Sequence, residues 1–320
     1  MKAIRIKEFG GTEVLHLEEV ERPIPAHDEI LVKVYASGVN PVDCAIRKGG
    51  NDVLRPLLKL PLILGCDAAG IVEEVGTSVA NFKKGDEVYG CPNFPGNGSY
   101  AEYVAARANQ FALKPKSISF NEASAVPLTA LVAWAGLFEL GKLEKGQRVL
   151  IHGASGGVGN FAAQFAKAKG AYVIATASAG NLAFLKEIGA DEVIDYKTQK
   201  FEQLLQNIDI VLDASPIRDN DERLKSISVL RDGGVYVSVN VDFPFDEKVE
   251  EALVKKNIRG EMVAGQKHAH LAEIANLIDA GTVKVFVSKV YPLKQVAEAH
   301  KESEMWHVRG KLVLEVRKES

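Results

Sequence analysis

A glycine-rich turn between two apolar runs is the stretch of this chain whose residue types are best suited to chemistry. Residues 148–152 (RVLIH) form the first run and residues 172–176 (YVIAT) the second, with an amphipathic segment between them. This order of apolar run, turn, amphipathic segment and apolar run predicts a β-α-β unit. Ala154, Gly156 and Gly159 occupy the three critical positions of a dinucleotide fingerprint, with Ala in place of the first Gly.

The spacing of these small residues predicts a pyrophosphate site. The first small residue allows a tight turn after the strand, Gly156 lets the backbone approach a pyrophosphate, and Gly159 lets the helix pack closely on the sheet. Free N–H groups at the start of the helix, near Gly157 and Val158, face the anion. We therefore expect residues 154–159, including Ser155, to bind a dinucleotide. An ordinary glycine-rich turn is the structural alternative.

The residues after the second apolar run indicate which dinucleotide binds. Sites for NAD usually carry Asp or Glu here to hold the ribose 2′-hydroxyl, and that carboxylate would repel a 2′-phosphate. The chain has no acid between Thr176 and Asn181, where Ser178 and Asn181 can hydrogen-bond a phosphate. NADPH is therefore favoured over NADH. The same two side chains are equally suited to capping the helix that follows.

The composition is that of an ordinary globular protein without a strong charge bias. The chain has 320 residues, of which 47% are hydrophobic and 25% charged, and its net charge is −3. This length suggests two domains, and the charge gives no general attraction to nucleic acid or to an anionic membrane. No apolar run is long enough to span a bilayer, and the first ten residues read as a strand instead of a signal peptide. We expect a cytosolic protein with no nucleic-acid or membrane partner.

Cysteine and histidine spacing does not indicate a metal site. Cys44, Cys66 and Cys91 lie far apart with no CxxC motif, and the seven histidines are dispersed. Neither a ligand cluster nor a nucleophile–base pair can be assigned from them.

The pattern of elements predicts an α/β protein. Residues 1–120 contain short β-like runs separated by turn residues, which is typical of a barrel-like or sandwich domain. Residues 120–140 read as one long helix with Asn121 as its cap and Pro127 as an interruption. Strand–helix alternation from residue 148 onward predicts a doubly wound parallel sheet. Residues 268–280 read as a helix, and a final strand–helix–strand pattern is expected to return to the first domain.

Motifs along the whole chain resemble one protein family. They are, in order, GVNPVD (38–43), LGCDAAGIVEEVG (64–76), GDEVYG (85–90), GSYAEYV (98–104), the ASGGVG turn, GADEVIDY (189–196) and the ending RGKLVLEV. The chain resembles the medium-chain dehydrogenase/reductase superfamily, and most of all its zinc-free quinone oxidoreductase and alkenal double-bond reductase branch. The resemblance implies a GroES-like catalytic domain (1–121 and 289–320), a Rossmann-like NADPH domain (122–288) and a homodimer.

The resemblance also implies which residues form the site. It places the Asn40 amide by the nicotinamide and Tyr100 beside the site, where each could donate to a carbonyl oxygen that becomes negative during hydride transfer. Tyr196 is expected near the adenine or the 2′-phosphate. Structural roles remain open for all three: a turn cap before Pro41, a core tyrosine and a strand-end tyrosine. The expected cofactor neighbours at later strand ends are Ala214, Ser215, Val239, Asn240, Ala264 and Gly265.

Departures from the family pattern decide what reaction is expected. Zinc alcohol dehydrogenases of the superfamily carry Cys and His ligands where this chain has Asn40 and Cys66, and a lone thiol cannot make a three-ligand site. The Tyr and Thr of bacterial quinone reductases are replaced by Ala45 and Val132, which leaves the acceptor open. We predict NADPH-dependent, zinc-independent hydride transfer to a quinone or an α,β-unsaturated carbonyl. A catalytically silent NADPH-binding sensor is the alternative, and a zinc alcohol dehydrogenase is less favoured.

Overall fold

The structure, a computed structural model, describes residues 1–265 and 267–319. The described chain forms two compact units. Unit 1 comprises Met1–Leu128, His268–Gly281 and Val285–Ser320, and unit 2 comprises Thr129–Lys267 and Thr282–Lys284. The domain limits expected from the sequence, 1–121 with 289–320 and 122–288, differ chiefly in that residues 268–281 belong to unit 1. Side-chain contacts explain this difference, because the Tyr89 hydroxyl donates to the Leu271 carbonyl and Asp279 accepts from Ser117.

The larger sheet of unit 1 is organised around β3. β3 (EILVKVYASGV) is rich in β-branched residues and mostly buried, as expected for a strand covered on both faces. The strand order is β15-β16-β3-β5-β6-β8, and β7 also pairs with β3. The bounds are β3 Glu29–Val39, β5 Ala68–Val75, β6 Glu87–Gly90, β7 Tyr103–Arg107, β8 Phe111–Leu113, β15 Val287–Pro292 and β16 Lys311–Glu315. The smaller sheet has the order β2-β1-β4, with β1 Lys2–Ile6, β2 His16–Glu19 and β4 Leu62–Ile63.

The last strand returns to the first unit, as the sequence predicts. β16 pairs antiparallel with β3, and Leu312 lies opposite Val39 in the register. The helix α10 (Val296–Ser303) connects β15 to β16, which lie parallel to each other. The end of the chain therefore completes the sheet that its beginning starts.

Unit 2 contains the doubly wound parallel sheet that the alternation predicts. Its strand order is β11-β10-β9-β12-β13-β14, and each pairing is parallel. The bounds are β9 Arg148–His152, β10 Tyr172–Ala177, β11 Glu192–Asp195, β12 Ile208–Asp213, β13 Leu230–Ser238 and β14 Arg259–Met262. The strand order reverses at β9, between β10 and β12. Ligands of such sheets bind beyond the carboxyl ends of the strands at this reversal.

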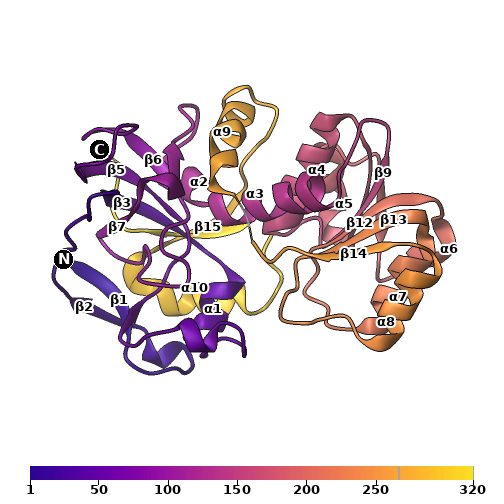
Figure 1. The fold of residues 1–320 in the computed structure, drawn as a ribbon, viewed down its shortest axis with the longest axis horizontal. Helices are drawn as coiled ribbons and strands as arrows, with labels where there is room; N and C mark the ends of the chain where they lie inside the picture. The colour runs from indigo at the N-terminus through magenta and orange to yellow at the C-terminus, as the bar shows by residue number, and fades with distance from the viewer. Residues whose placement is uncertain (266, 320) are drawn as a thin grey trace. The chain divides into compact units, whose positions relative to one another are not determined.

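Helices lie on both faces of the unit 2 sheet. Figure 1 shows α4 and α5 on one side and α7 and α8 on the other. Apolar side chains of the strands, including Leu150, Ile174 and Val211, form one buried cluster with residues from the α6–α8 segment. Burying one such side chain contributes about 1.5–3 kcal/mol. The bounds are α4 Gly157–Lys169, α5 Leu182–Glu187, α6 Phe201–Leu204, α7 Asn220–Val229 and α8 Glu247–Lys255.

The helix predicted over residues 120–140 is confirmed in its interruption at Pro127, but its predicted cap, Asn121, is wrong. The segment forms α2 (Phe120–Ser124) and α3 (Pro127–Trp134), followed by a π-helical stretch over Ala135–Leu140. The cap of α2 is Ser119 instead of Asn121. The Ser119 hydroxyl accepts from the Glu122 N–H at 3.2 Å while the Glu122 carboxylate accepts from the Ser119 N–H. This reciprocal pair is a capping box, a signal present in the sequence as Ser-x-x-Glu.

Two further helices complete unit 1. α1 (Pro41–Arg47) was missed in the sequence, although Pro at a first helical position is a common start signal. The helix predicted over 268–280 is confirmed as a 3₁₀ turn followed by α9 (Leu271–Asp279).

Short 3₁₀ turns occur in both units. They are Thr12–Val14, Arg55–Leu57, Ala108–Gln110, Ala179–Asn181, His268–His270 and Leu293–Gln295.

Candidate active site

The turn between β9 and α4 owes its tightness to Gly153. This residue has φ of +67°, and a Cβ on it would lie 2.5 Å from the Ala214 carbonyl oxygen. Only glycine meets both conditions without strain. Ala154, to which the sequence assigned the tight turn, follows it and is fully buried. The contact also places Ala214, at the end of β12, directly against the glycine turn.

Gly156 and Gly159 are glycines for different reasons. A Cβ on Gly159 would lie 2.3 Å from the Gly153 carbonyl oxygen, so this glycine allows α4 to pack on the turn, as expected. At Gly156 the nearest atom to such a Cβ, chain neighbours excluded, is the same oxygen at 3.4 Å. The described chain therefore leaves room in front of Gly156. Because the first N–H groups of a helix lack internal partners, this space beside the start of α4 fits a pyrophosphate.

Asn160 holds the glycine turn in place, a role that the sequence did not reveal. Its Nδ2 atom donates to the carbonyl oxygens of Gly156 at 2.8 Å and Gly157 at 3.0 Å. Its Oδ1 atom is buried and has no hydrogen-bond partner within the described part of the chain. The turn is thus preorganised by its own helix, which lowers the ordering cost of binding a ligand there.

The ends of β12 and β13 bring together the residues expected there. The Asn240 Nδ2 atom donates to the Ser215 carbonyl oxygen at 3.0 Å, and the Val239 N–H donates to the Asp213 carbonyl oxygen at 3.0 Å. Asp213 also accepts from the Ser215 hydroxyl at 2.7 Å and from the Tyr236 hydroxyl at 2.9 Å. These contacts fix the backbone at the carboxyl edge of the sheet. Ala264 and Gly265 follow the end of β14, the next strand along that edge.

The residues expected to meet the 2′-phosphate lie beyond β10 and β11. Ser178 and Asn181 contact each other at 3.4 Å, and neither makes a side-chain capping bond to its helix in the described structure. The capping alternative is therefore not realised. The side chain of Tyr196, after β11, is 51% exposed. The three residues remain suited to a polar ligand, and no acid stands among them.

Thr176 points inward instead. Its hydroxyl lies 3.0 Å from the Nδ1 atom of His152, and the Nε2 atom of His152 lies 3.0 Å from the Ser226 hydroxyl. Burial lowers the pKa of His152, so the ring is neutral and serves as a hydrogen-bonded link across the sheet. His152 was not singled out in the sequence, where a lone histidine at a strand end gives no signal.

Asn40 begins α1 and lies inside a buried polar cluster of unit 1. Its backbone N–H donates to Asp43 Oδ2 at 2.8 Å, which matches the expectation of a turn or helix cap before Pro41. Its side-chain Nδ2 donates to Asp67 Oδ2 at 2.9 Å, and its Oδ1 accepts from the Lys311 ammonium. The side chain is almost completely buried. Both ends of the amide are therefore occupied by protein groups.

Lys311 and Asp67 form a buried ion pair around Asn40. The Lys311 Nζ atom lies 3.6 Å from Asp67 Oδ2 and donates to the Val39 carbonyl oxygen at 2.8 Å. Burial raises the pKa of Asp67 to about 6, although Lys311 and Asn40 act in the opposite direction. Both residues belong to motifs of the sequence, but nothing there showed that residues 67 and 311 meet.

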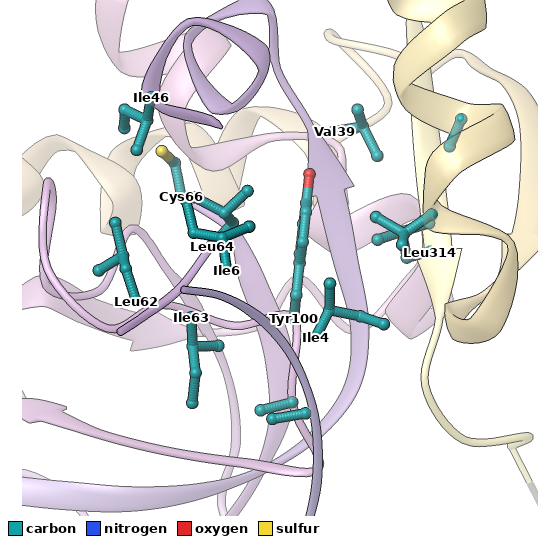
Figure 2. Packing of buried hydrophobic residues seen from close by; sticks show 14 of the residues in the cluster. Ile4, Ile6, Val39, Ile46, Leu62, Ile63, Leu64, Cys66, Tyr100 and Leu314 are labelled. Carbon is teal, nitrogen blue, oxygen red and sulfur yellow. The ribbon is translucent and has the colours of Figure 1, made fainter. Parts of the chain in front are cut away.

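Tyr100 is fully buried in the same unit. Its hydroxyl donates to Asp43 Oδ2 at 3.1 Å and lies 3.2 Å from His300 Nε2. In Figure 2 its ring stands among apolar side chains, with Ile4 and Ile63 nearer the ring base than the hydroxyl. Burial raises the pKa of Tyr100 well above its usual range. The hydroxyl is thus committed to protein partners.

Cys66 lies between the same cluster and a small apolar pocket. Its thiol and its backbone N–H both donate to Asp43 Oδ1, at 3.0 and 3.1 Å. Ile46, Leu64 and Phe94 line the pocket beside it. Burial raises the pKa of Cys66 well above its usual range, so the thiol stays protonated. Among residues 1–265 and 267–319, no group of three His, Cys, Asp or Glu side chains could hold a metal ion.

Comparison with known proteins identifies the family. A model described as the alcohol dehydrogenase GroES-like domain matches residues 26–116, and one described as zinc-binding dehydrogenase matches residues 188–314. The quinone oxidoreductase of Sus scrofa is 33% identical over 324 residues, covering 97% of this chain and 95% of the relative. The chain belongs to the quinone oxidoreductase branch of the medium-chain dehydrogenase/reductase superfamily. The mitochondrial NAD(P)H oxidoreductase RTN4IP1 of Danio rerio is 32% identical, covering 99% and 91% of the two chains.

Solved structures agree with this family membership. The quinone oxidoreductase from Coxiella burnetii is similar with a TM-score of 0.90 and 35% identity, covering 99% of each chain. The Escherichia coli quinone oxidoreductase complexed with NADPH has a TM-score of 0.85 and 31% identity, covering 98% of this chain and 99% of that one. The protein is an NAD(P)H-dependent oxidoreductase. No helix in the described part of this family member is both long and apolar enough to cross a membrane.

Proposed function

We propose that this protein transfers hydride from NADPH to a quinone or an α,β-unsaturated carbonyl without zinc. The observation that carries the proposal is the space in front of Gly156, at the start of α4 and at the strand-order reversal of the sheet. Open space at a glycine also occurs in surface turns, as at Gly85 and Gly146, so its position before a helix and at the strand-order reversal is what supports the proposal. A dinucleotide pyrophosphate needs open space there.

NADPH, when bound, supplies the hydride, and residues of unit 2 would hold it. Residues 154–159 would take the pyrophosphate. Ser178, Asn181 and Tyr196 would take the adenosine 2′-phosphate. Thr176 and the strand-end residues would line the remainder of the cofactor: Ala214, Ser215, Val239, Asn240, Ala264 and Gly265.

Zinc independence is supported by the chemistry of the side chains at the expected ligand positions. Zinc needs three protein ligands, whereas the Cys66 thiol donates to Asp43 and no three His, Cys, Asp or Glu side chains of the described residues come together. The Asn40 amide is held between Asp67 and Lys311, whose cation already supplies positive charge beside the carboxylate. A divalent ion would have to displace that ammonium. These residues do not fit a catalytic zinc.

Asn40 and Tyr100 enter this proposal as residues that shape the site. The sequence suggested that both donate directly to the acceptor oxygen. Both side chains are buried and hydrogen-bonded within unit 1, and this geometry favours an indirect role through Asp43 and Asp67. The proton that completes the reduction is then supplied by solvent.

The test of the function is NADPH oxidation by metal-analysed protein against a panel of quinones and α,β-unsaturated carbonyls, with NADH in parallel. We expect turnover that is faster with NADPH and unaffected by removal of metal. The preferred acceptor class would then decide between quinone and alkene reduction. Tight NADPH binding without turnover on any acceptor would favour a catalytically silent NADPH-binding sensor. Loss of activity on treatment with a chelator would favour a zinc-dependent alcohol dehydrogenase.

Cofactor preference has its own prediction at Ser178. In the variant Ser178→Asp, a carboxylate would face the 2′-phosphate, and like charges placed together cost several kcal/mol. We expect the Kd for NADPH to rise about tenfold or more, while the Kd for NADH changes by less than about threefold. Fluorescence titration of both cofactors measures this, with Ser178→Asn as the neutral control. Equal weakening of both cofactors would mean that Ser178 lies away from the 2′-phosphate.

Two further expectations belong to the same proposal. A cytoplasmic location is supported by the cysteines, because Cys44, Cys66 and Cys91 are all buried and free, as in reducing compartments. A homodimer is expected from the family resemblance, and the molar mass in solution would test it.

A further inference from the structure

Arg47 and His300 lie directly behind Tyr100 in the buried cluster of unit 1. The Arg47 side chain, at the end of α1, is only 1% exposed. One of its terminal nitrogens lies 3.2 Å from His300 Nδ1, and the other donates to Glu304 at 2.7 Å. His300, on α10, is fully buried, and its Nε2 atom lies 3.2 Å from the Tyr100 hydroxyl. Neither residue was singled out in the sequence.

The direction of every hydrogen bond along this line follows from Arg47. A guanidinium carries only donors and does not lose its proton in proteins, so His300 Nδ1 must accept. A neutral imidazole that accepts at Nδ1 carries its proton at Nε2, and His300 therefore donates to the Tyr100 oxygen. The one proton of Tyr100 is then directed to Asp43 Oδ2, 3.1 Å away. The successive hydrogen bonds from Arg47 to His300, from His300 to Tyr100 and from Tyr100 to Asp43 therefore all run in the same direction.

Asp43 is the last acceptor of the hydrogen-bond chain that runs from Arg47 through His300 and Tyr100, and it also contacts Asn40 and Cys66. Its Oδ2 atom accepts from the Tyr100 hydroxyl and the Asn40 N–H, and its Oδ1 atom accepts from the thiol and the N–H of Cys66. One buried carboxylate thus joins the start of α1 to the segment that borders the apolar pocket. If the Tyr100 hydroxyl proton pointed elsewhere, Asp43 would lose a donor. Its carboxylate would then be held less firmly, and so would Asn40 and Cys66, which donate to it.

We propose that Arg47 and His300 are positioning residues that fix the Tyr100 hydroxyl as a donor to Asp43, and so hold Asn40 at the start of α1 and Cys66 beside the apolar pocket. They act through Tyr100 and touch neither substrate nor cofactor. The turnover part of the test rests on the proposed function, whereas the tautomer part does not.

The protonation behaviour of the groups is consistent with this arrangement. Burial, with Arg47 acting in the same direction, lowers the pKa of His300 to about 3, so its ring is neutral at pH 7. Burial also raises the pKa of Tyr100 well above its usual range, which keeps the hydroxyl proton in place. Asp43 accepts in this way while its carboxyl group is ionised; burial raises its pKa, and the hydrogen bonds from Cys66 and Asn40 act in the opposite direction.

The first experiment reads the His300 tautomer at pH 7 by ¹⁵N NMR of the imidazole nitrogens. In the unchanged protein we expect the proton on Nε2. Tyr100→Phe should leave this tautomer in place because Arg47 still donates to Nδ1, whereas Arg47→Met should admit the Nδ1–H form. An Nδ1–H ring in the unchanged protein, or a tautomer that changes in Tyr100→Phe, would overturn the proposal. The tautomers of the unchanged protein and of Tyr100→Phe test the proposal even if Arg47→Met does not fold.

The second experiment separates positioning from simple packing. His300→Phe keeps the ring volume but removes both nitrogens, whereas Gln in His300→Gln can accept from Arg47 and donate to Tyr100. We expect kcat with a quinone or enone to fall about tenfold in His300→Phe and to recover to within about threefold of the unchanged protein in His300→Gln. The Kd for NADPH should stay the same in both. Equal kcat losses in the two variants would contradict a role of His300 in directing the Tyr100 proton. Absence of turnover in the unchanged protein would count against the proposed function. The positioning role would then be tested by the His300 tautomer alone.

Discussion

Replacing Gly156 with valine is expected to abolish NADPH binding without disturbing the fold. Gly156 has an extended backbone, with φ of −77° and ψ of −177°, which any residue can adopt. Its nearest neighbour beyond the adjacent residues is the Gly153 oxygen at 3.4 Å from an added Cβ, an ordinary contact. The valine side chain would instead occupy the space where the pyrophosphate approaches α4. We expect the Kd for NADPH to rise at least about 100-fold and the melting temperature to change by less than about 3 °C.

A matched control for this variant stands three residues further on. A Cβ at Gly159 would lie 2.3 Å from the Gly153 oxygen, so Gly159→Ala forces the helix away from the turn. Overpacking of this kind costs about 1–3 kcal/mol, and we expect a clear drop in melting temperature. Fluorescence titration and thermal unfolding of the two variants separate loss of a ligand from loss of packing. Unchanged NADPH affinity in Gly156→Val would mean that the pyrophosphate binds elsewhere.

Replacing Lys311 with methionine is expected to cause a large loss of stability. The ammonium is buried with Asp67 and Asn40, and its removal leaves the Asp67 carboxylate without its cation. Breaking a buried pair by removing one partner costs about 3–5 kcal/mol. Asp43, which Lys311 also affects electrostatically, loses support as well. We expect the free energy of unfolding at pH 7 to fall by this amount.

The stability that Lys311→Met loses should depend on pH, because it depends on whether Asp67 is ionised. Its pKa in the folded protein is about 6, above the ordinary value of 3.8. A carboxyl group of this kind contributes stability that is complete below pH 3.8 and is lost as the pH rises through 6. Without Lys311 the pKa of Asp67 rises further, so the folded variant loses stability over a higher pH range. Lys311→Met should therefore be closer to the unchanged protein at pH 5 than at pH 8.

Urea unfolding at the two pH values measures this difference. The double variant Lys311→Met with Asp67→Asn removes the uncompensated charge and should recover part of the loss. Lys289→Met is the matched control, because Lys289 is half exposed and its pair with Glu302 is worth at most about 1 kcal/mol. A loss of equal size at pH 5 and pH 8 would exclude Asp67 as the responsible group.

The elements of this protein could be predicted where the signal is local. Strand–helix alternation indicated the parallel sheet of unit 2, and the apolar pattern of residues 311–315 indicated the returning strand. Local signals were also overlooked. The capping box that begins at Ser119 defines the start of α2, and Gly153, with its positive φ, makes the turn that was assigned to Ala154.

The buried cluster of unit 1 could not be read from the sequence because its partners are far apart along the chain. Asn40 and Lys311 are separated by 271 positions, and Tyr100 and His300 by 200. The family resemblance implied that Asn40 and Tyr100 donate to a substrate, a role that amide and phenol groups can fill. Whether such a donor is free or already satisfied depends on tertiary contacts, and here both are satisfied within the fold.

The return of β16 to β3 has a consequence for the order in which the protein can be assembled at the ribosome. Lys311 and the strand that carries it are synthesised after every other strand described, so the buried carboxylate of Asp67 has no cation beside it until β16 has been made. Unit 2 draws its strands from residues 148–262 and can close its sheet earlier. Until β16 emerges, β3 lacks its partner over Ala36–Val39, although β7 already pairs with Glu29–Lys33 on that edge, and unpaired edges are where nascent chains associate wrongly. We therefore expect unit 1 to be more exposed to misassociation than unit 2 during that interval.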